Sequence, residues 1–209
     1  MRKTVYSLVL TPEIIDAVDR MAYAQGTSRS NLIDKILAEA VGYVTPQQQV
    51  QQIFDTILQG IGGEFRMQDA PAGDWMTLCR QLRYRYKPTV RYRVEVLPHS
   101  DAPTAILQAS FRTQSAELLS EVNEFFRVYS LAEVAYGVCS AEQIRRENGK
   151  WSRLFPISHA ELRQPALLGE RMAGYIRRFD GLLQQYFSAL PNRRAAVSLV
   201  TDAFVSELQ

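Results

Sequence analysis

The residue types that most often carry catalysis or bind metals are few and scattered in this chain. Cys79 and Cys139 are the two cysteines, and no second thiol or histidine lies beside either of them in the sequence. His99 falls in a predicted turn, and His159 falls in the first turn of a predicted helix near Glu161. Neither histidine has a nucleophile or metal ligand at the spacing that these chemistries need. The sequence therefore predicts no metal site, no cofactor and no disulfide framework.

Motifs of common enzymes do not occur in the sequence either. The glycine-rich run 60–63 follows a predicted helix and precedes no Lys-Ser or Lys-Thr pair, so helix termination explains it better than a phosphate-binding loop. Glu121, Glu124 and Glu133 fall on ordinary amphipathic helices. We therefore expect no catalysis, although a site assembled only in three dimensions remains an alternative.

The strongest charge feature is a basic cluster between residues 76 and 100. The segment holds six basic residues against Glu95, a local net charge of +5, whereas the whole chain has 24 Lys and Arg against 22 Asp and Glu. Guanidinium groups match phosphate geometry, so the cluster predicts a surface for a phosphate backbone or an anionic ligand. The alternative is that the arginines only solubilise the outer face of a sheet. The candidate residues are Arg83, Arg85, Arg91, Arg93 and Arg112, and the neighbouring Tyr84, Tyr86 and Tyr92 would suit single-stranded nucleic acid.

Hydrophobic periodicity places this cluster in an α+β domain over residues 46–209. Three segments within about 76–112 alternate in strand fashion, with apolar residues on one face and arginines on the other, which predicts a three-stranded antiparallel sheet. A brief extended piece is expected over 151–155. The predicted helices are 46–60, about 115–130, 141–148, 166–190 and 194–208.

Residues 1–45 predict a separate module in the order strand, helix, helix. The segment 3–10 is rich in β-branched and aromatic residues, and Thr11-Pro12-Glu13 then provides a helix start. Ser28 follows Gly26 and would cap a second helix. A lone strand leaves its backbone groups unpaired, so pairing with a second copy of the chain is expected. The module therefore predicts a homodimer.

The same residues resemble the ribbon-helix-helix repressors, a family that includes Arc, MetJ and CopG. The resemblance rests on Tyr6-Ser7-Leu8-Val9-Leu10-Thr11-Pro12-Glu13 and on Gly26-Thr27-Ser28-Arg29-Ser30. In that family a two-stranded ribbon enters the major groove of DNA, and the start of the second helix binds phosphate. The resemblance implies base-facing positions at Lys3, Val5, Ser7 and Val9, and phosphate-binding positions at Thr27, Ser28, Arg29 and Ser30.

Together these patterns predict an α+β protein with an N-terminal ribbon-helix-helix module and a C-terminal domain for oligomerisation or sensing. The expected function is a homodimeric, cytoplasmic DNA-binding protein, a transcriptional repressor, with double-stranded DNA as its partner and a small ligand or protein on the C-terminal domain. One alternative is an accessory protein for plasmid partition or DNA processing. Another is a dimeric scaffold without DNA binding, since residues 1–50 carry five basic and five acidic groups. No segment is apolar enough to predict a membrane span.

Overall fold

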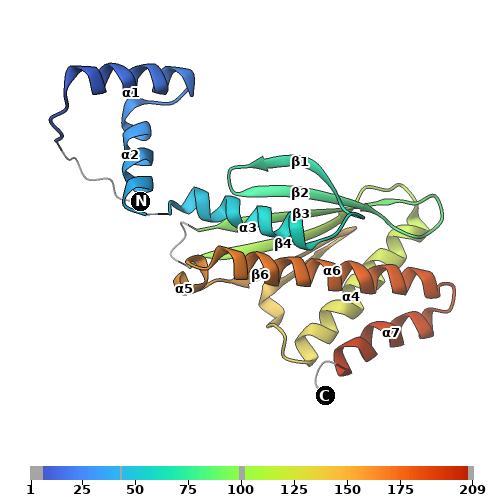
Figure 1. Cartoon of the computed structure of the whole chain (residues 1–209). Coiled ribbons are helices and arrows are strands. Elements are labelled where there is room, and N and C mark those ends of the chain that lie inside the picture. The colour runs from blue at the N-terminus through green and yellow to red at the C-terminus, as the bar shows by residue number, and fades with distance from the viewer. Residues whose placement is uncertain (1–6, 43, 99–101, 207–209) are drawn as a thin grey trace. The chain divides into compact units, whose positions relative to one another are not determined.

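The computed structural model of the chain describes residues 7–42, 44–98 and 102–206. The chain divides into two compact units, Met1–Gln48 and Gln49–Gln209, and each unit has its own core. The elements, most of which are labelled in Figure 1, are α1 (Pro12–Ala24), α2 (Arg29–Ala40), α3 (Pro46–Gly60), β1 (Arg66–Ala72), β2 (Trp75–Gln81), β3 (Thr89–Leu97), β4 (Thr104–Phe111), α4 (Ala116–Ala135), the short 3₁₀ helix η1 (Ala141–Gln143), β5 (Ile144–Glu147), β6 (Lys150–Pro156), α5 (His159–Leu162), α6 (Pro165–Ala189) and α7 (Arg193–Val205).

The N-terminal unit consists of α1 and α2, and each helix begins where the sequence provides a start signal. Pro12 is the first residue of α1, where its missing N–H group is not needed. Ser28 precedes α2, and its hydroxyl accepts a hydrogen bond from the Asn31 N–H at 3.3 Å. Gly26, between the helices, has a φ of +62°, which glycine adopts without strain. The core of this unit is small and consists of Val18, Ala22 and Leu32, with Ile33 packed against it.

The predicted N-terminal strand is wrong over the part of it that the structure describes. Residues 7–10 have no regular secondary structure, and Val9 is fully exposed. Lys3 and Val5 lie outside the described residues. A strand is stable only when its backbone groups are paired, and the described residues of the N-terminal unit offer 7–10 no partner strand. The ribbon-helix-helix assignment is therefore corrected to two helices, which residues 7–10 precede without regular secondary structure.

The second unit belongs to the predicted α+β class, but its sheet has six strands instead of three. All neighbours are antiparallel, in the order β1-β2-β3-β4-β6-β5. The predicted helix over 141–148 is also wrong, because η1 ends at Gln143 and β5 follows it. Asn148 and Gly149 connect β5 to β6, and Gly149 has a φ of +70°. Asn-Gly is a strong hairpin signal, and here it prevails over the helix start at Ser140.

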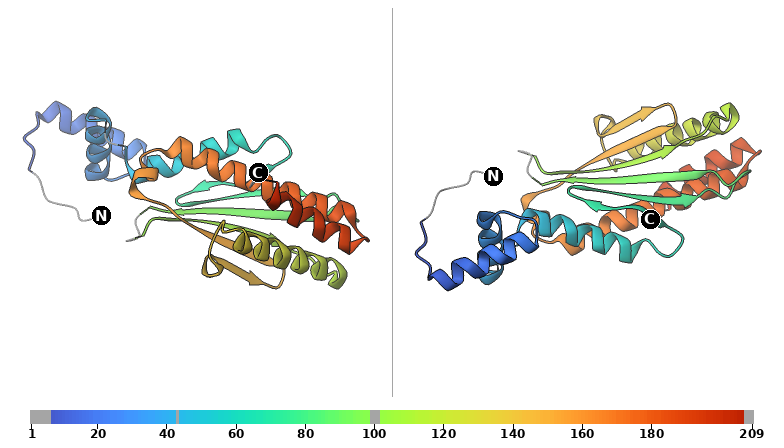
Figure 2. Two further views of the ribbon diagram at one scale, coloured as in Figure 1. Left: turned by 90° about the horizontal axis from the view of Figure 1, so that it is seen from below. Right: turned by 90° about the horizontal axis from the view of Figure 1, so that it is seen from above.

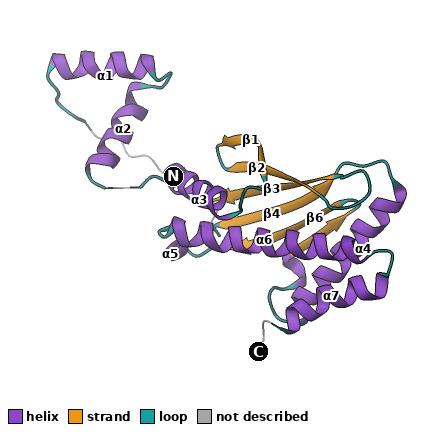
Figure 3. Ribbon diagram, turned by 45° about the vertical axis from the view of Figure 1, so that its right-hand side comes forward, coloured by secondary structure: helices purple, strands orange, loops and turns teal. Residues whose placement is uncertain are grey.

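Helices cover one face of this sheet, which we call the covered face. Buried and half-exposed side chains alternate along β3 and β4. Phe179 of α6 contacts both Tyr92 and Trp151 on the covered face, and Phe126 of α4 contacts Trp151 as well. Figure 3 shows the strands gathered into this single sheet. The opposite face, which we call the open face, carries the half-exposed side chains.

Helices α3 and α6 pack closely enough to require glycine at their contact. A Cβ atom on Gly169 would lie 2.6 Å from Cβ of Thr56 and 2.9 Å from the carbonyl oxygen of Ile53. A Cβ atom on Gly60 would lie 2.8 Å from Cβ of Ala173. Both views in Figure 2 show the two helices side by side. Among the described helices, none has the length and apolar character needed to cross a membrane.

The two outermost strands of the sheet are short or irregular. The register of β1 against β2 shifts between Met67 and Asp69 and again between Asp69 and Ala72, and Pro71 lies within this second interval. Strand β5 has only four residues, of which Arg145, Arg146 and Glu147 are charged and exposed. Neither edge therefore presents a long regular ladder of free backbone groups.

Candidate nucleic-acid interface

Basic side chains form a row across the open face of the sheet. Arg91 in β3 pairs with Cys79 in β2 and with Ser110 in β4. Cys79 pairs in turn with Arg66 in β1, and Ser110 pairs with Lys150 in β6. Because directly paired residues of antiparallel strands project to the same face, the three cations share the open face in one row.

A second row, two residues further along the strands, carries Arg93 and Arg145. Arg93 is joined to Arg145 of β5 through the successive pairs Arg93–Gln108, Gln108–Ser152 and Ser152–Arg145. The guanidinium of Arg93 lies 4.4 Å from the ring centre of Trp75, and its Nε lies 3.9 Å from a carboxylate oxygen of Glu95. These contacts hold Arg93 against the sheet, so it is less available for a ligand than Arg91.

The remaining predicted arginines flank the first row. Arg83 and Arg85 lie in the connection from β2 to β3, and Arg112 directly follows β4. Arg83 pairs with Glu64 at 2.9 Å, and Arg85 lies 3.8 Å from Glu117. Both pairs are exposed, and such pairs are weak because water screens them. We use "the basic end" for the set Arg66, Arg83, Arg85, Lys87, Arg91, Arg112 and Lys150.

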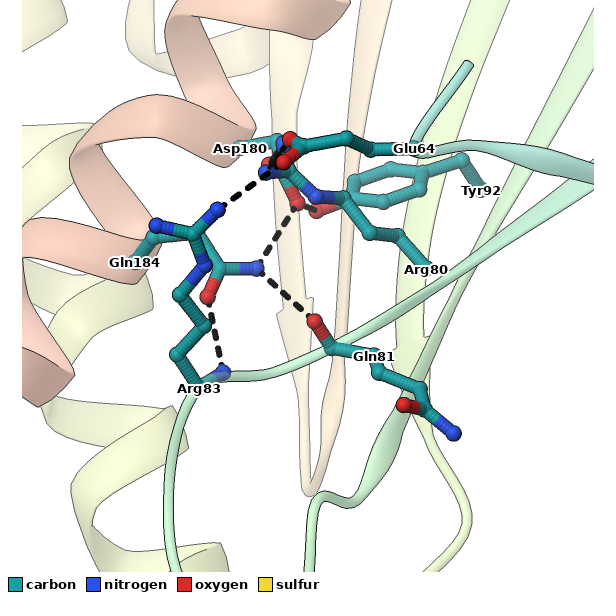
Figure 4. A network of polar contacts seen from close by, with 7 residues as sticks. All are labelled: Glu64, Arg80, Gln81, Arg83, Tyr92, Asp180 and Gln184. Carbon is teal, nitrogen blue, oxygen red and sulfur yellow. Dashed lines mark hydrogen bonds and ion pairs between the residues drawn. The ribbon is translucent and has the colours of Figure 1, made fainter.

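A buried polar network holds the β2–β3 connection against α6 (Figure 4). The side-chain oxygen of Gln184 accepts a hydrogen bond from the Arg83 N–H at 2.8 Å, and its amide nitrogen donates to the carbonyl oxygen of Gln81 at 3.2 Å. Arg80 pairs with Asp180 and with Glu64. The network therefore fixes the backbone of the β2–β3 connection at Gln81 and Arg83, next to the exposed cations of the basic end.

Asp180 is fully buried and is the central acceptor of this network. The hydroxyl of Tyr92 donates to its Oδ1 at 2.7 Å, and Arg80 pairs with its other oxygen. Burial raises the pKa of the Asp180 carboxyl, while the hydrogen bond from Tyr92 and the charge of Arg80 act in the opposite direction. Burial also raises the pKa of Tyr92, so this hydroxyl keeps its proton and remains a donor.

The sequence grouped six basic residues in one region and placed Arg83, Arg85, Arg91 and Arg93 on one face, but it assigned Arg80 to neither face. Arg80 is turned to the covered face and bound to Asp180, so it is removed from the open face. Arg66 and Lys150 were not singled out, because β1 and the β5–β6 hairpin were not predicted. The Asn148-Gly149 pair was the signal that would have placed Lys150 at the start of a strand.

The tyrosines predicted to stack on nucleic acid do not share the open face. Tyr92 is buried on the covered face, and Tyr84 packs edge-on against Phe187 with ring centres 5.1 Å apart. Only Tyr86 of the three is fully exposed, at the tip of the β2–β3 connection. The expectation of a stacking platform built from the three is therefore wrong.

The predicted N-terminal contact residues lie around α2 or ahead of α1. Ser7 and Val9 are exposed in the segment before α1, while Lys3 and Val5 lie outside the described residues. Thr27 and Ser28 lead into α2, and Arg29 and Ser30 are its first residues. Arg29 forms a two-point ion pair with Asp19 of α1, which neutralises the cation of this group.

The residues that could have carried metal or nucleophilic chemistry are dispersed. His159 is the first residue of α5, His99 lies outside the described residues, and Cys79 and Cys139 are free thiols on different elements. Within the described residues, no three His, Cys, Asp or Glu side chains come together to form a metal site.

The fold and this surface define an α+β protein with one sheet face covered by helices and a basic end on the other. No protein-family model matches the chain, no curated protein is significantly similar to it, and no solved structure matches it. Function is therefore inferred from the chain's own geometry.

Proposed function

We propose that the chain is a homodimeric DNA-binding protein, acting in transcriptional regulation, whose basic end contacts the phosphate backbone of double-stranded DNA. The observation that carries the proposal is the row of Arg66, Arg91 and Lys150 across the open face, flanked by Arg112 and the β2–β3 connection. Among the described residues, Arg66, Arg91 and Arg112 form no ion pair. The charges of these three arginines are therefore available to a polyanion. Lys150 lies 3.9 Å from a carboxylate oxygen of the exposed Glu147, a pair that water screens.

The spacing of the row suits a repeating anion. Neighbouring strands lie about 4.8 Å apart, so Arg66 and Arg91 are separated by roughly 10 Å, and Arg91 and Lys150 by a similar distance. A DNA duplex carries one charge for about every 1.7 Å of its axis, so a row about 19 Å long faces several phosphates at once. Phosphate contacts of this kind give affinity and orientation without reading base sequence.

The N-terminal unit supports the dimeric part of the proposal. The core that its described residues form has three members, which is small for a domain of this size, because short chains bury little of their apolar surface without help. At the same time both helices expose large apolar side chains, including Ile14, Met21, Ile36 and Leu37. A second copy of the chain would cover these side chains and supply the missing core.

Replacing two cations of the row tests the DNA contact. In a chain with Arg91→Gln and Lys150→Gln, we expect the affinity for a fluorescein-labelled duplex to fall about tenfold or more at low salt. The slope of log affinity against log salt should become shallower by about 2, because each lost phosphate contact contributes about 0.9. Fluorescence anisotropy at a series of salt concentrations measures both quantities.

Arg163→Gln provides a matched control. Arg163 is exposed and follows α5, at the end of the sheet opposite Lys150, so its replacement should leave the affinity and the slope unchanged. If the double variant binds DNA with the wild-type slope, the basic end makes no phosphate contact. If the wild-type chain binds no duplex, the dimeric scaffold becomes the better description.

A further inference from the structure

A hollow of about 560 Å³ lies at the basic end, where β2 continues past the first residue of β1. This volume is in the range of pockets that hold small molecules. Its walls include four cations, one carboxylate and one aromatic ring, and these six residues are Glu64, Arg66, Arg80, Arg83, Tyr84 and Lys87. The hollow combines charge with an aromatic wall, as ligand sites commonly do.

The charges around the hollow leave an excess that matches one particular class of anion. The four cations of its walls are opposed by Glu64 and, behind Arg80, by the buried Asp180. The resulting excess is two positive charges. A phosphate monoester carries a charge of about −1.5 to −2 at neutral pH, whereas the diester of a nucleic-acid backbone carries one.

Glu64 holds the position that an entering anion would take. Its two carboxylate oxygens bind Arg80 and Arg83, and the side chain is more than half exposed. Both arginines are held from the other side, Arg80 by Asp180 and the Arg83 backbone by Gln184 (Figure 4). An anion that displaced Glu64 would therefore meet the guanidinium of Arg80 already in place, and that of Arg83 on a fixed backbone.

Backbone strain marks the same place. Tyr86 and Lys87 have φ values of 60° and 43°. These lie in the left-handed region, which residues other than glycine and asparagine rarely adopt. The Lys87 N–H donates to the carbonyl oxygen of Tyr84 at 2.9 Å, which holds the turn closed. Strain of this kind is concentrated at binding sites, and here it fixes a cation at the wall of the hollow.

We propose that this hollow binds the phosphate group of a small phosphomonoester, with Arg80, Arg83 and Lys87 as the phosphate ligands and Tyr84 beside the organic part. The site goes beyond the proposed DNA contact, because the ligand is a small molecule and the deciding residue, Lys87, lies in the connection between the strands. Such a site would give the C-terminal domain a sensing function.

Titration with phenyl phosphate and with dimethyl phosphate tests the proposal. We expect phenyl phosphate to bind saturably, with chemical-shift changes in ¹H–¹⁵N spectra confined to residues 64–66 and 79–89. Dimethyl phosphate, a monoanionic diester like the DNA backbone, should bind at least about tenfold more weakly because it offers half the charge. Equal affinity for the two esters, or no binding of either, would overturn the proposal.

Three substitutions should change the affinity for phenyl phosphate in three different ways. Lys87→Asn removes the cation while keeping a residue that tolerates the left-handed backbone, and it should weaken phenyl phosphate binding about tenfold. Glu64→Gln removes the competing carboxylate and should strengthen binding several-fold. Arg85→Asn is the matched control, since Arg85 lies in the same connection but does not line the hollow, and it should leave binding unchanged.

Anisotropy with labelled duplex DNA separates this proposal from the previous one. Lys87 and Arg85 are both flanking cations of the basic end, so Lys87→Asn should weaken DNA binding no more than Arg85→Asn does, whereas Lys87→Asn alone should weaken phenyl phosphate binding. A loss of DNA affinity equal to the loss of phenyl phosphate affinity would assign the hollow to the DNA surface and overturn a separate small-molecule site.

Discussion

The thiol of Cys139 lies 3.9 Å from a carboxylate oxygen of Glu133, within a buried polar group on the covered side of the sheet. Arg153 pairs with Glu133, and the hydroxyl of Tyr175 donates to the same carboxylate at 2.8 Å. Burial raises the pKa of the Cys139 thiol, and the negative charge of Glu133 raises it further. Since the thiolate is the reactive form, a raised pKa means less thiolate at a given pH.

The alkylation rate of Cys139 tests this environment. In a Cys79→Ser chain, where Cys139 is the single thiol, iodoacetamide should react several-fold more slowly at pH 8 than with an unstructured cysteine peptide. The rate should continue to rise above pH 9, the ordinary value for this group, because the thiol loses its proton only at higher pH. Mass spectrometry over a pH series measures the alkylation rate. A rate equal to that of the peptide would contradict a raised pKa for the Cys139 thiol.

Glu133 also illustrates where sequence reasoning reaches its limit at the residue scale. The sequence predicted only that Glu133 lies on an ordinary amphipathic helix, and the side chain is in fact fully buried. Its partners Arg153 and Tyr175 are 20 and 42 residues away in the chain, so no local spacing reveals them. Metal and nucleophile motifs, by contrast, are mostly local in sequence, so their residue spacing can be examined without knowing the fold.

At the scale of elements, the contact between α3 and α6 depends on two glycines, Gly60 and Gly169, of which Gly169 makes the closer approach. Gly169→Ala would drive its Cβ into Thr56 and into the Ile53 carbonyl group, so we expect a loss of about 1 to 3 kcal/mol in the free energy of unfolding. Gly174→Ala in the same helix has no atom within 4 Å of the new Cβ and should stabilise by about 0.5 to 1 kcal/mol. Urea denaturation of both variants measures the difference, and equal effects would exclude close packing as the cause.

The helices were easier to predict than the strands, for physical reasons. Helix starts depend on local signals such as Pro12 and Pro46, and the structure begins helices at both residues. Strands depend on distant partners, so β1, which contains Asp69 and Pro71, had no recognisable strand pattern. The basic cluster was likewise visible as a run of residues. Placing Arg80 on the covered face, however, required the observed pairing of β2 with β3.

At the scale of the whole molecule, the chain joins a well-packed sheet unit to a helical unit with a very small core. If that core is completed by a second copy, charges on the apolar faces of α1 and α2 should separate the copies. Ile14→Glu with Ile36→Glu should convert a dimer of 23.8 kDa chains to monomer, as measured by light scattering after gel filtration. Leu167→Glu, exposed on α6, is the control and should remain dimeric. A monomeric wild-type chain at micromolar concentration would contradict the proposal.

The two edge strands of the sheet determine whether copies of this chain can associate strand to strand. A regular edge strand invites another strand to join it, which leads to open-ended stacking. Here Pro71 and the shifted register interrupt one edge, and three successive charges occupy the other over only four residues. Strand-to-strand growth is therefore disfavoured at both edges, in agreement with the proposal that a second copy joins through the apolar faces of the N-terminal helices. A two-fold contact of that kind would close as a pair and would not extend further.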